Sequence, residues 1–224
     1  MHILKTNFDG NPNVGLYMFC NNKYCLVPRN CPEKLFQKLK LILKVKVHRI
    51  TIAGTSLIGV FVSGNNNGIL VPKITFEEEI RQLDKLNIRY NIIDTRLTAL
   101  GNNILCNDNS CLINPDYEKD TIKIIEAAVE VPVKKAMIND LHTIGSMAKL
   151  TNFHGLVHHD IKDFEQKFIE KNMKIKLTRG TVNFGSPYIS SGVICNKNGF
   201  VIGDLSGGPE IANADEALGF VKGD

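Results

Sequence analysis

The chain has 224 residues, of which 43% are hydrophobic and 22% charged, a composition typical of a globular protein with a sizeable core. Its 27 basic and 23 acidic residues give a net charge of +4, without the dense basic stripe of a dedicated nucleic-acid binder. No apolar run approaches the ~20 residues that span a bilayer, and Lys5, Asn7 and Asp9 interrupt any signal-peptide core. We therefore expect a cytoplasmic protein that does not insert into a membrane.

The first predicted element is a strand, His2–Phe8, and it is followed by the first of five similar hairpins. The hairpins begin at Gly15, Gly59, Gly101, Gly145 and Gly192, and by subtraction these starts are 44, 42, 44 and 47 residues apart. Each hairpin passes through a short strand and a turn into a second strand; in the second copy these are Val60–Ser63, Gly64–Gly68 and Ile69–Val71. So regular an interval indicates an internal repeat.

Each turn carries an Asn or Asp three residues before the second strand, namely Asn21, Asn65, Asp108, Asn152 and Asn196. Helices with apolar residues at helical spacing are predicted after the hairpins, at Pro32–Lys44, Thr75–Leu86, Asp116–Val129, Asp160–Lys171 and, more weakly, Pro209–Phe220. Thr75 with Glu78 has the spacing of a capping box, and Asp116 and Asp160 are suitable N-caps. A further strand follows in HRITIAG, YNIIDTR, KAMIND and IKLTRGT, so the unit is strand, strand, helix, strand.

The fifth unit has no closing strand of its own, and His2–Phe8 is placed to supply it. We expect an α/β protein of the α+β kind, with a single domain of five units in pseudo-fivefold symmetry, its ring closed by the N-terminal strand. The units cover about 15–58, 59–100, 101–144, 145–191, and 192–224 together with 1–14. Closure would also remove the exposed strand edges that invite aggregation. The last residues, Val221–Asp224, are expected to fray.

Six cysteines leave several interpretations open. There is no C-x-x-C pair, and Cys20/Cys25 and Cys106/Cys111 span hairpins, so buried thiols are the default, with cross-hairpin disulfides or zinc as alternatives. His158 and His159 resemble a ligand pair, but neighbours on a strand point to opposite faces. Cys195 with one of these histidines would make a nucleophilic pair. Without a phosphate-binding motif, we predict no catalytic residue, metal or cofactor.

Seven segments, taken together, resemble the archaeal and eukaryotic translation initiation factor 6 family. They are YCLVP at Tyr24–Pro28, TIAGTSLIG at Thr51–Gly59, NGILVP at Asn67–Pro72, RLTALGN at Arg96–Asn102, CND at Cys106–Asp108, GLVH at Gly155–His158 and GTVNFGS at Gly180–Ser186. The similarity extends over nearly the whole chain. It implies the pentein fold, a β/α-propeller of five units with helices outside, which agrees with the repeat.

The resemblance implies a non-enzymatic protein that binds the intersubunit face of the large ribosomal subunit and blocks association with the small subunit. Ribosomal proteins near the sarcin–ricin loop and some rRNA are the implied partners, with a role in ribosome biogenesis; we expect a monomer without a small-molecule substrate. Matching positions assign binding to Asn66, Asn102 and Asp108, and to Val60 and Tyr188, which occupy corresponding places on neighbouring units. Turn chemistry is the alternative role for the Asn and Asp residues. The alternative functions are a guanidino-modifying pentein enzyme using Cys195, and a scaffold for other proteins.

Overall fold

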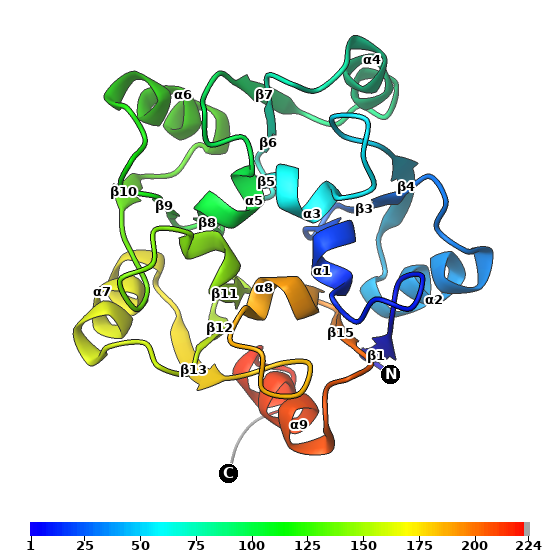
Figure 1. The fold of residues 1–224 in the computed structure, drawn as a ribbon, viewed down its shortest axis with the longest axis vertical. Helices are drawn as coiled ribbons and strands as arrows, with labels where there is room; N and C mark the ends of the chain where they lie inside the picture. The colour runs from blue at the N-terminus through cyan, green and yellow to red at the C-terminus, as the bar shows by residue number, and fades with distance from the viewer. Residues whose placement is uncertain (222–224) are drawn as a thin grey trace.

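The computed structural model describes residues 1–221 and contains five small three-stranded sheets arranged about a centre (Figure 1). The sheets, in the order of the units, are β2-β3-β4, β5-β6-β7, β8-β9-β10, β11-β12-β13 and β14-β15-β1. The prediction of a fivefold repeated α/β arrangement is therefore confirmed. Residues 222–224, which hold most of the segment expected to fray, lie outside the described part of the chain. None of the helices in residues 1–221 is long and apolar enough to cross a membrane.

Each unit begins near the centre and ends at the rim. The inner helices are α1 (Val14–Tyr17), α3 (Ile58–Phe61), α5 (Leu100–Asn103), η1 (Ile144–Ser146, a 3-10 turn) and α8 (Ile189–Gly192). The inner strands are β2 (Phe19–Cys20), β5 (Ser63–Gly64), β8 (Ile104–Cys106), β11 (Ala148–Leu150) and β14 (Val193–Asn196). The middle strands are β3 (Tyr24–Pro28), β6 (Ile69–Pro72), β9 (Cys111–Ile113), β12 (His154–His158) and β15 (Gly199–Gly203).

The outer helices lie at the rim, and an outer strand completes each sheet. The helices are α2 (Glu33–Leu43), α4 (Glu77–Lys85), α6 (Lys119–Val129), α7 (Asp163–Met173) and α9 (Gly208–Ala217). The strands are β4 (Lys46–Ile50), β7 (Tyr90–Ile93), β10 (Val133–Lys135), β13 (Lys176–Gly180) and β1 (Ile3–Thr6). Every middle strand is antiparallel to its inner strand and parallel to its outer strand.

The N-terminal strand pairs within the fifth unit, as predicted. Strand β1 runs parallel to β15, with Ile3 opposite Phe200 and Thr6 opposite Gly203. The inner helix α1 of the first unit also contacts α8 of the fifth. The two ends of the chain therefore meet in one sheet, and β1 occupies the place that an outer strand takes in the other units.

The opening segment of each repeat is a helical turn, so the prediction of a strand there was wrong. Val60, for example, lies in α3, and only Ser63 and Gly64 form the strand that follows. The reason is close packing at the centre, where an added Cβ on Gly15, Gly59, Gly101 or Gly145 would come within 3.0 Å of a backbone oxygen in a neighbouring inner helix. The fifth residue of this series is Ser190 rather than the predicted Gly192, because the Cβ of Gly15 would overlap the carbonyl of Ser190.

Four of the five outer helices start later than predicted, α9 starts one residue earlier, and the predicted caps differ. Asp116 and Asp160 precede the helices that begin at Lys119 and Asp163, and Thr75 donates to the Pro72 carbonyl instead of capping α4. In three units a glutamate in the first turn of the outer helix accepts a hydrogen bond from the N-cap N–H. The same glutamate accepts a second bond from an N–H of the tight turn that precedes the inner helix of its unit. These glutamates are Glu79, Glu165 and Glu210. The third outer strand also lies earlier than KAMIND, at Val133–Lys135.

The hydrophobic core lies between the units rather than inside them. Successive residues of a strand point to opposite faces. In β3, Val27 packs with Ile194 of the fifth unit, whereas Leu26 packs with Val71 of the second. Both faces of a middle strand are therefore buried, which explains apolar runs such as ILVP. A single unit could not bury its own strands, so the repeat is stable only as a set.

The central glycines provide a direct test of this packing. We expect Gly101→Ala to lower the free energy of unfolding by about 3 kcal/mol or more, because its Cβ would overlap the carbonyls of Gly59 and Val62. The control is Gly208→Ala at the start of α9, where nothing lies within 4 Å of the added Cβ. That change should leave stability unchanged or raise it by up to ~1 kcal/mol. Urea unfolding would measure both, and equal effects would contradict the close approach.

Candidate functional site

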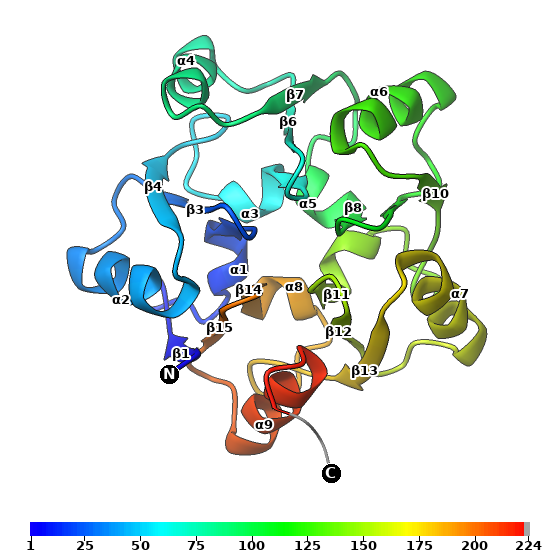
Figure 2. The same cartoon turned by 180° about the vertical axis from the view of Figure 1, so that it is seen from behind.

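The central axis has two chemically different ends. We call the end formed by the inner helices the helix end, and the end formed by the hairpin turns at 21–24, 65–68, 107–110, 151–154 and 196–199 the turn end. Figure 1 views the molecule from the helix end and Figure 2 from the turn end. A cavity of about 390 Å³ lies at the turn end, and a separate cavity of about 300 Å³ lies at the helix end.

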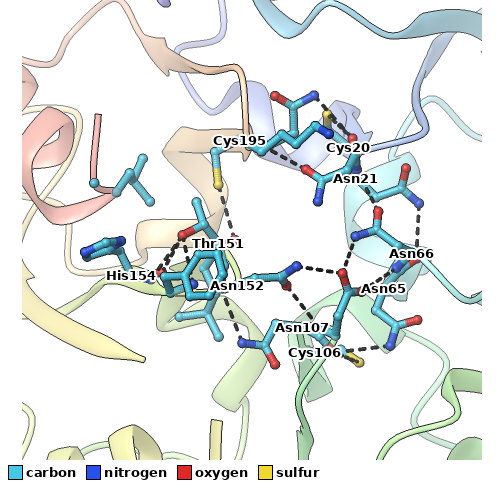
Figure 3. Close-up of a pocket in the computed structure, with 18 of the residues that line it drawn as sticks. Cys20, Asn21, Asn65, Asn66, Cys106, Asn107, Thr151, Asn152, His154 and Cys195 are labelled. Atoms are coloured by element: carbon cyan, nitrogen blue, oxygen red, sulfur yellow. Dashed lines mark hydrogen bonds between the residues drawn. The ribbon is translucent and has the colours of Figure 1, made fainter. Parts of the chain in front are cut away.

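The turn end is built from one asparagine at the start of each turn in four of the units, namely Asn21, Asn65, Asn107 and Asn196, all buried. Each side-chain oxygen accepts the N–H two residues later, at 2.9 Å in all four turns. Each side-chain amide donates to the carbonyl of the equivalent residue in the next unit, at 3.1 to 3.4 Å (Figure 3). These amides therefore fix each turn and tie each unit to the next.

A second row of bonds runs through the following residues, Asn22, Asn66, Asp108, Asn152 and Lys197. The backbone N–H of Asn66 donates to a carboxylate oxygen of Asp108 at 2.9 Å, and the N–H of Asp108 donates to the side-chain oxygen of Asn152 at 3.1 Å. The other oxygen of Asp108 accepts the amides of Asn66 and Asn152. In the same series the backbone N–H of Lys197 donates to the side-chain oxygen of Asn22 at 2.8 Å. Asp108 thus takes bonds from both neighbouring units.

The predicted alignment of the turns was one residue out in two units. Asn107 and Thr151, rather than Asp108 and Asn152, are equivalent to Asn65. The pattern Asn-x-Asn would have shown the correct alignment, because it recurs at 65–67, 107–109 and 196–198. Its second asparagine donates to the last carbonyl of an outer helix: Asn67 to Val129, Asn109 to Met173 and Asn198 to Leu43.

Cys195 lies in the wall of the turn-end cavity but is not prepared for nucleophilic attack. Its thiol donates to the Leu150 carbonyl at 3.4 Å, and burial raises its pKa to about 12. A cysteine that serves as a catalytic nucleophile at neutral pH needs the opposite shift, because the thiolate is the reactive form. The histidine that lines this cavity is His154, so the predicted partners His158 and His159 are not brought to Cys195 there.

His158 and His159 lie on the same side, contrary to the prediction of opposite faces. Their rings stack at 5.0 Å with an angle of 8° between the planes, because β12 ends at His158 and strand alternation stops there. Ligand atoms of these histidines and Asp160 lie within 4.8 Å of one another, so the trio could hold a metal ion. Nδ1 of His158 already accepts the Asp160 N–H at 3.0 Å. Burial lowers the pKa of His158.

The five predicted binding residues fall at opposite ends of the axis. Asn66 and Asp108 line the turn-end cavity, whereas Asn102 and Tyr188 line the helix-end cavity and Val60 lies on α3 at the same end. Val60 and Asn102 are equivalent, because each is the third residue of its inner helix. Tyr188 precedes α8 and belongs to the fifth unit, so the predicted correspondence of Val60 with Tyr188 was wrong.

Side chains at the helix end are partly exposed. Tyr188 is 49% exposed, and Asn102 lines the same cavity. The turn end is different, since the carboxylate of Asp108 and the amide of Asn66 bond to each other. The helix end therefore carries exposed side chains, whereas polar side chains at the turn end bond to one another.

The asparagine bonds can be tested by substitution. We expect Asn107→Ala to lower the free energy of unfolding by about 3 kcal/mol, because it leaves buried backbone groups without partners. Asn102→Ala, which removes an amide without such bonds, should change stability by no more than ~0.5 kcal/mol. Chemical denaturation compares the two. Equal losses of unfolding free energy would show that the turn-end hydrogen bonds do not contribute to stability.

Comparison with known proteins shows similarity to one family over nearly the whole chain. The model of the eIF-6 family matches residues 3–217. A protein of Saccharolobus islandicus named Translation initiation factor 6 is 37% identical over 98% of this chain and 100% of its own length. Proteins of the same name from Thermococcus onnurineus and Pyrococcus abyssi are 35% and 34% identical, each over 99% of this chain and 100% of their own. The chain therefore belongs to the eIF-6 family.

Proposed function

We propose that this protein binds the intersubunit face of the large ribosomal subunit and prevents the small subunit from joining. Membership of the eIF-6 family and the name Translation initiation factor 6 of its relatives support this proposal, and they point to a translation factor rather than an enzyme. In this proposal the protein acts in the cytoplasm as a monomer and takes part in ribosome biogenesis. Ribosomal proteins near the sarcin–ricin loop and adjacent rRNA are the proposed contacts.

The observation that carries the proposal is the difference between the two ends of the axis. The inner helices present Val60, Asn102 and Tyr188 on one surface, where Tyr188 is 49% exposed and lines a cavity together with Asn102. We propose this helix end as the docking surface. A role for Asn66 and Asp108 in binding stays a prediction, and their mutual bonds favour the structural role.

The proposed mechanism is steric and needs no chemical step. We propose that the five units form a closed ring of the pentein type, whose packing between units keeps the helix end rigid. A rigid surface loses little conformational entropy on binding. An interface of standard size buries ~800 Å² on each partner, an area that the inner helices and their loops could supply. Once docked, the bulk of the ring would occupy space that the small subunit needs.

The test is sedimentation of purified ribosomal subunits through sucrose gradients. We expect the protein to sediment with large subunits and, in excess, to reduce the fraction of joined subunits. The double variant Asn102→Ala/Tyr188→Ala should bind large subunits at least ~10-fold more weakly, because hot spots cluster on a few central side chains.

The matched control is Phe164→Ala, which removes an aromatic side chain, 69% exposed, from the outer helix α7. Phe164→Ala should bind as the unmodified protein does. Binding to small subunits alone, or unchanged subunit joining at saturating protein, would contradict the function. Equal weakening by both variants would contradict only the choice of the helix end.

A further inference from the structure

Two pairs of cysteines face each other across hairpins in equivalent places of the first and third units. Cys20 on β2 is the direct partner of Cys25 on β3, and Cys106 on β8 is the direct partner of Cys111 on β9. The equivalent pairs elsewhere are Gly64 with Ile69, Leu150 with Gly155 and Cys195 with Phe200. All six cysteines are free thiols in the structure, and Cys195 has no cysteine opposite it.

The backbone register places both pairs where a disulfide fits. Just beyond Cys20 and Cys25, the N–H of Asn21 donates to the carbonyl of Tyr24 at 3.1 Å. The cysteines are therefore the next pair along the ladder, which is not hydrogen-bonded and whose Cα atoms are ~4.5 Å apart in antiparallel sheets. Disulfides form across Cα separations of ~4.4 to 6.8 Å. The bond from Asn107 to Ser110, also 3.1 Å, gives the third unit the same arrangement.

One cysteine of each pair lies in the wall of a cavity. Cys20 and Cys106 line the turn-end cavity (Figure 3), whereas Cys25 and Cys111 are fully buried behind them. Burial raises the pKa of Cys20, and the hydrogen bond to Cys25 raises it further; Cys106 is shifted in the same way, by burial and by Cys111. Each pair therefore has one thiol in the cavity wall and, beside it, a second thiol that is fully buried.

We propose that Cys20–Cys25 and Cys106–Cys111 are two redox sites that form cross-strand disulfides by exchange with a low-molecular-weight disulfide. The thiolate of Cys20 or Cys106 attacks the small disulfide, forms a mixed disulfide and releases one small thiol. The buried partner loses its proton, attacks the protein sulfur of that mixed disulfide and releases the second small thiol. Two protein thiols are oxidised as one small disulfide is reduced to two thiols. Cys31 and Cys195 stay reduced.

These bonds would act on the turns that hold the units together. Asn21 and Asn107 directly follow Cys20 and Cys106, and their amides donate to the carbonyls of Asn65 and Thr151 in the next units. A disulfide at the base of the turn restricts the unfolded chain and holds the turn closed. Oxidation would thus stabilise the turn end without altering the helix end.

The experiment uses the full-length protein, incubated with glutathione disulfide in mildly alkaline buffer, since the raised pKa values slow exchange at neutral pH. Remaining thiols are then alkylated in denaturant and the protein is digested without reduction. Trypsin cleaves after Lys23, so the peptides holding Cys20 and Cys25 stay together only through a disulfide. Cleavage before Asp108 separates Cys106 from Cys111 in the same way.

We expect two disulfides and two alkylated cysteines, Cys31 and Cys195, with a thermal midpoint a few degrees higher that returns on reduction. Cys25→Val and Cys111→Val should each lose one disulfide and keep the other, whereas the control Cys195→Ala should keep both. If a valine variant fails to fold, Cys20→Ala or Cys106→Ala removes the same pair from the cavity wall. Six alkylated cysteines, a lasting mixed disulfide with glutathione, or a bridge that includes Cys195 would overturn the proposal.

Discussion

The close approach of backbones at the central axis is the constraint on which the rest of the structure depends. Four of the five inner helices meet a neighbour through a glycine whose Cβ position is already filled by a carbonyl oxygen. This approach brings the inner strands together, so that each middle strand is buried on both faces between two units. Without it, the apolar middle strands would have no second face to pack against, and the energy of burial would be lost.

The two ends of the axis differ in how their polar side chains are bonded. At the turn end the turns are close enough for side-chain amides to reach backbone carbonyls of the next unit, so the polar groups there satisfy one another. At the helix end Asn102 and Tyr188 line a cavity, and Tyr188 is 49% exposed. The bonds that tie the units together and the exposed side chains of the helix end thus belong to different residues.

The sequence predicted the repeat, the outer helices and the pairing of β1 because these depend on patterns within a single unit or on a missing strand. It failed where the decisive partner lies in another unit. Val60 was predicted in a strand because the packing of its neighbour Gly59 against the first unit is not visible in the sequence. Asp108 reads as the equivalent of Asn65 until the bonds between units identify Asn107. Val60, Asn102 and Tyr188 are predicted through the family resemblance alone, since no local pattern marks them.

Three departures from symmetry lie at one boundary, between the fourth and fifth units. There Ser190 replaces a glycine, Thr151 has no amide to donate, and Lys197 has no oxygen to accept the next bond in the second row. The boundary between the fifth and first units, by contrast, has its full set of bonds, from Asn196 to Asn21 and from Lys197 to Asn22. The fourth and fifth units are consecutive in the chain, so the short connection keeps them adjacent at little loss of entropy. The two chain ends lack that connection, and only noncovalent bonds can hold them together, which accounts for the complete set of bonds where they meet.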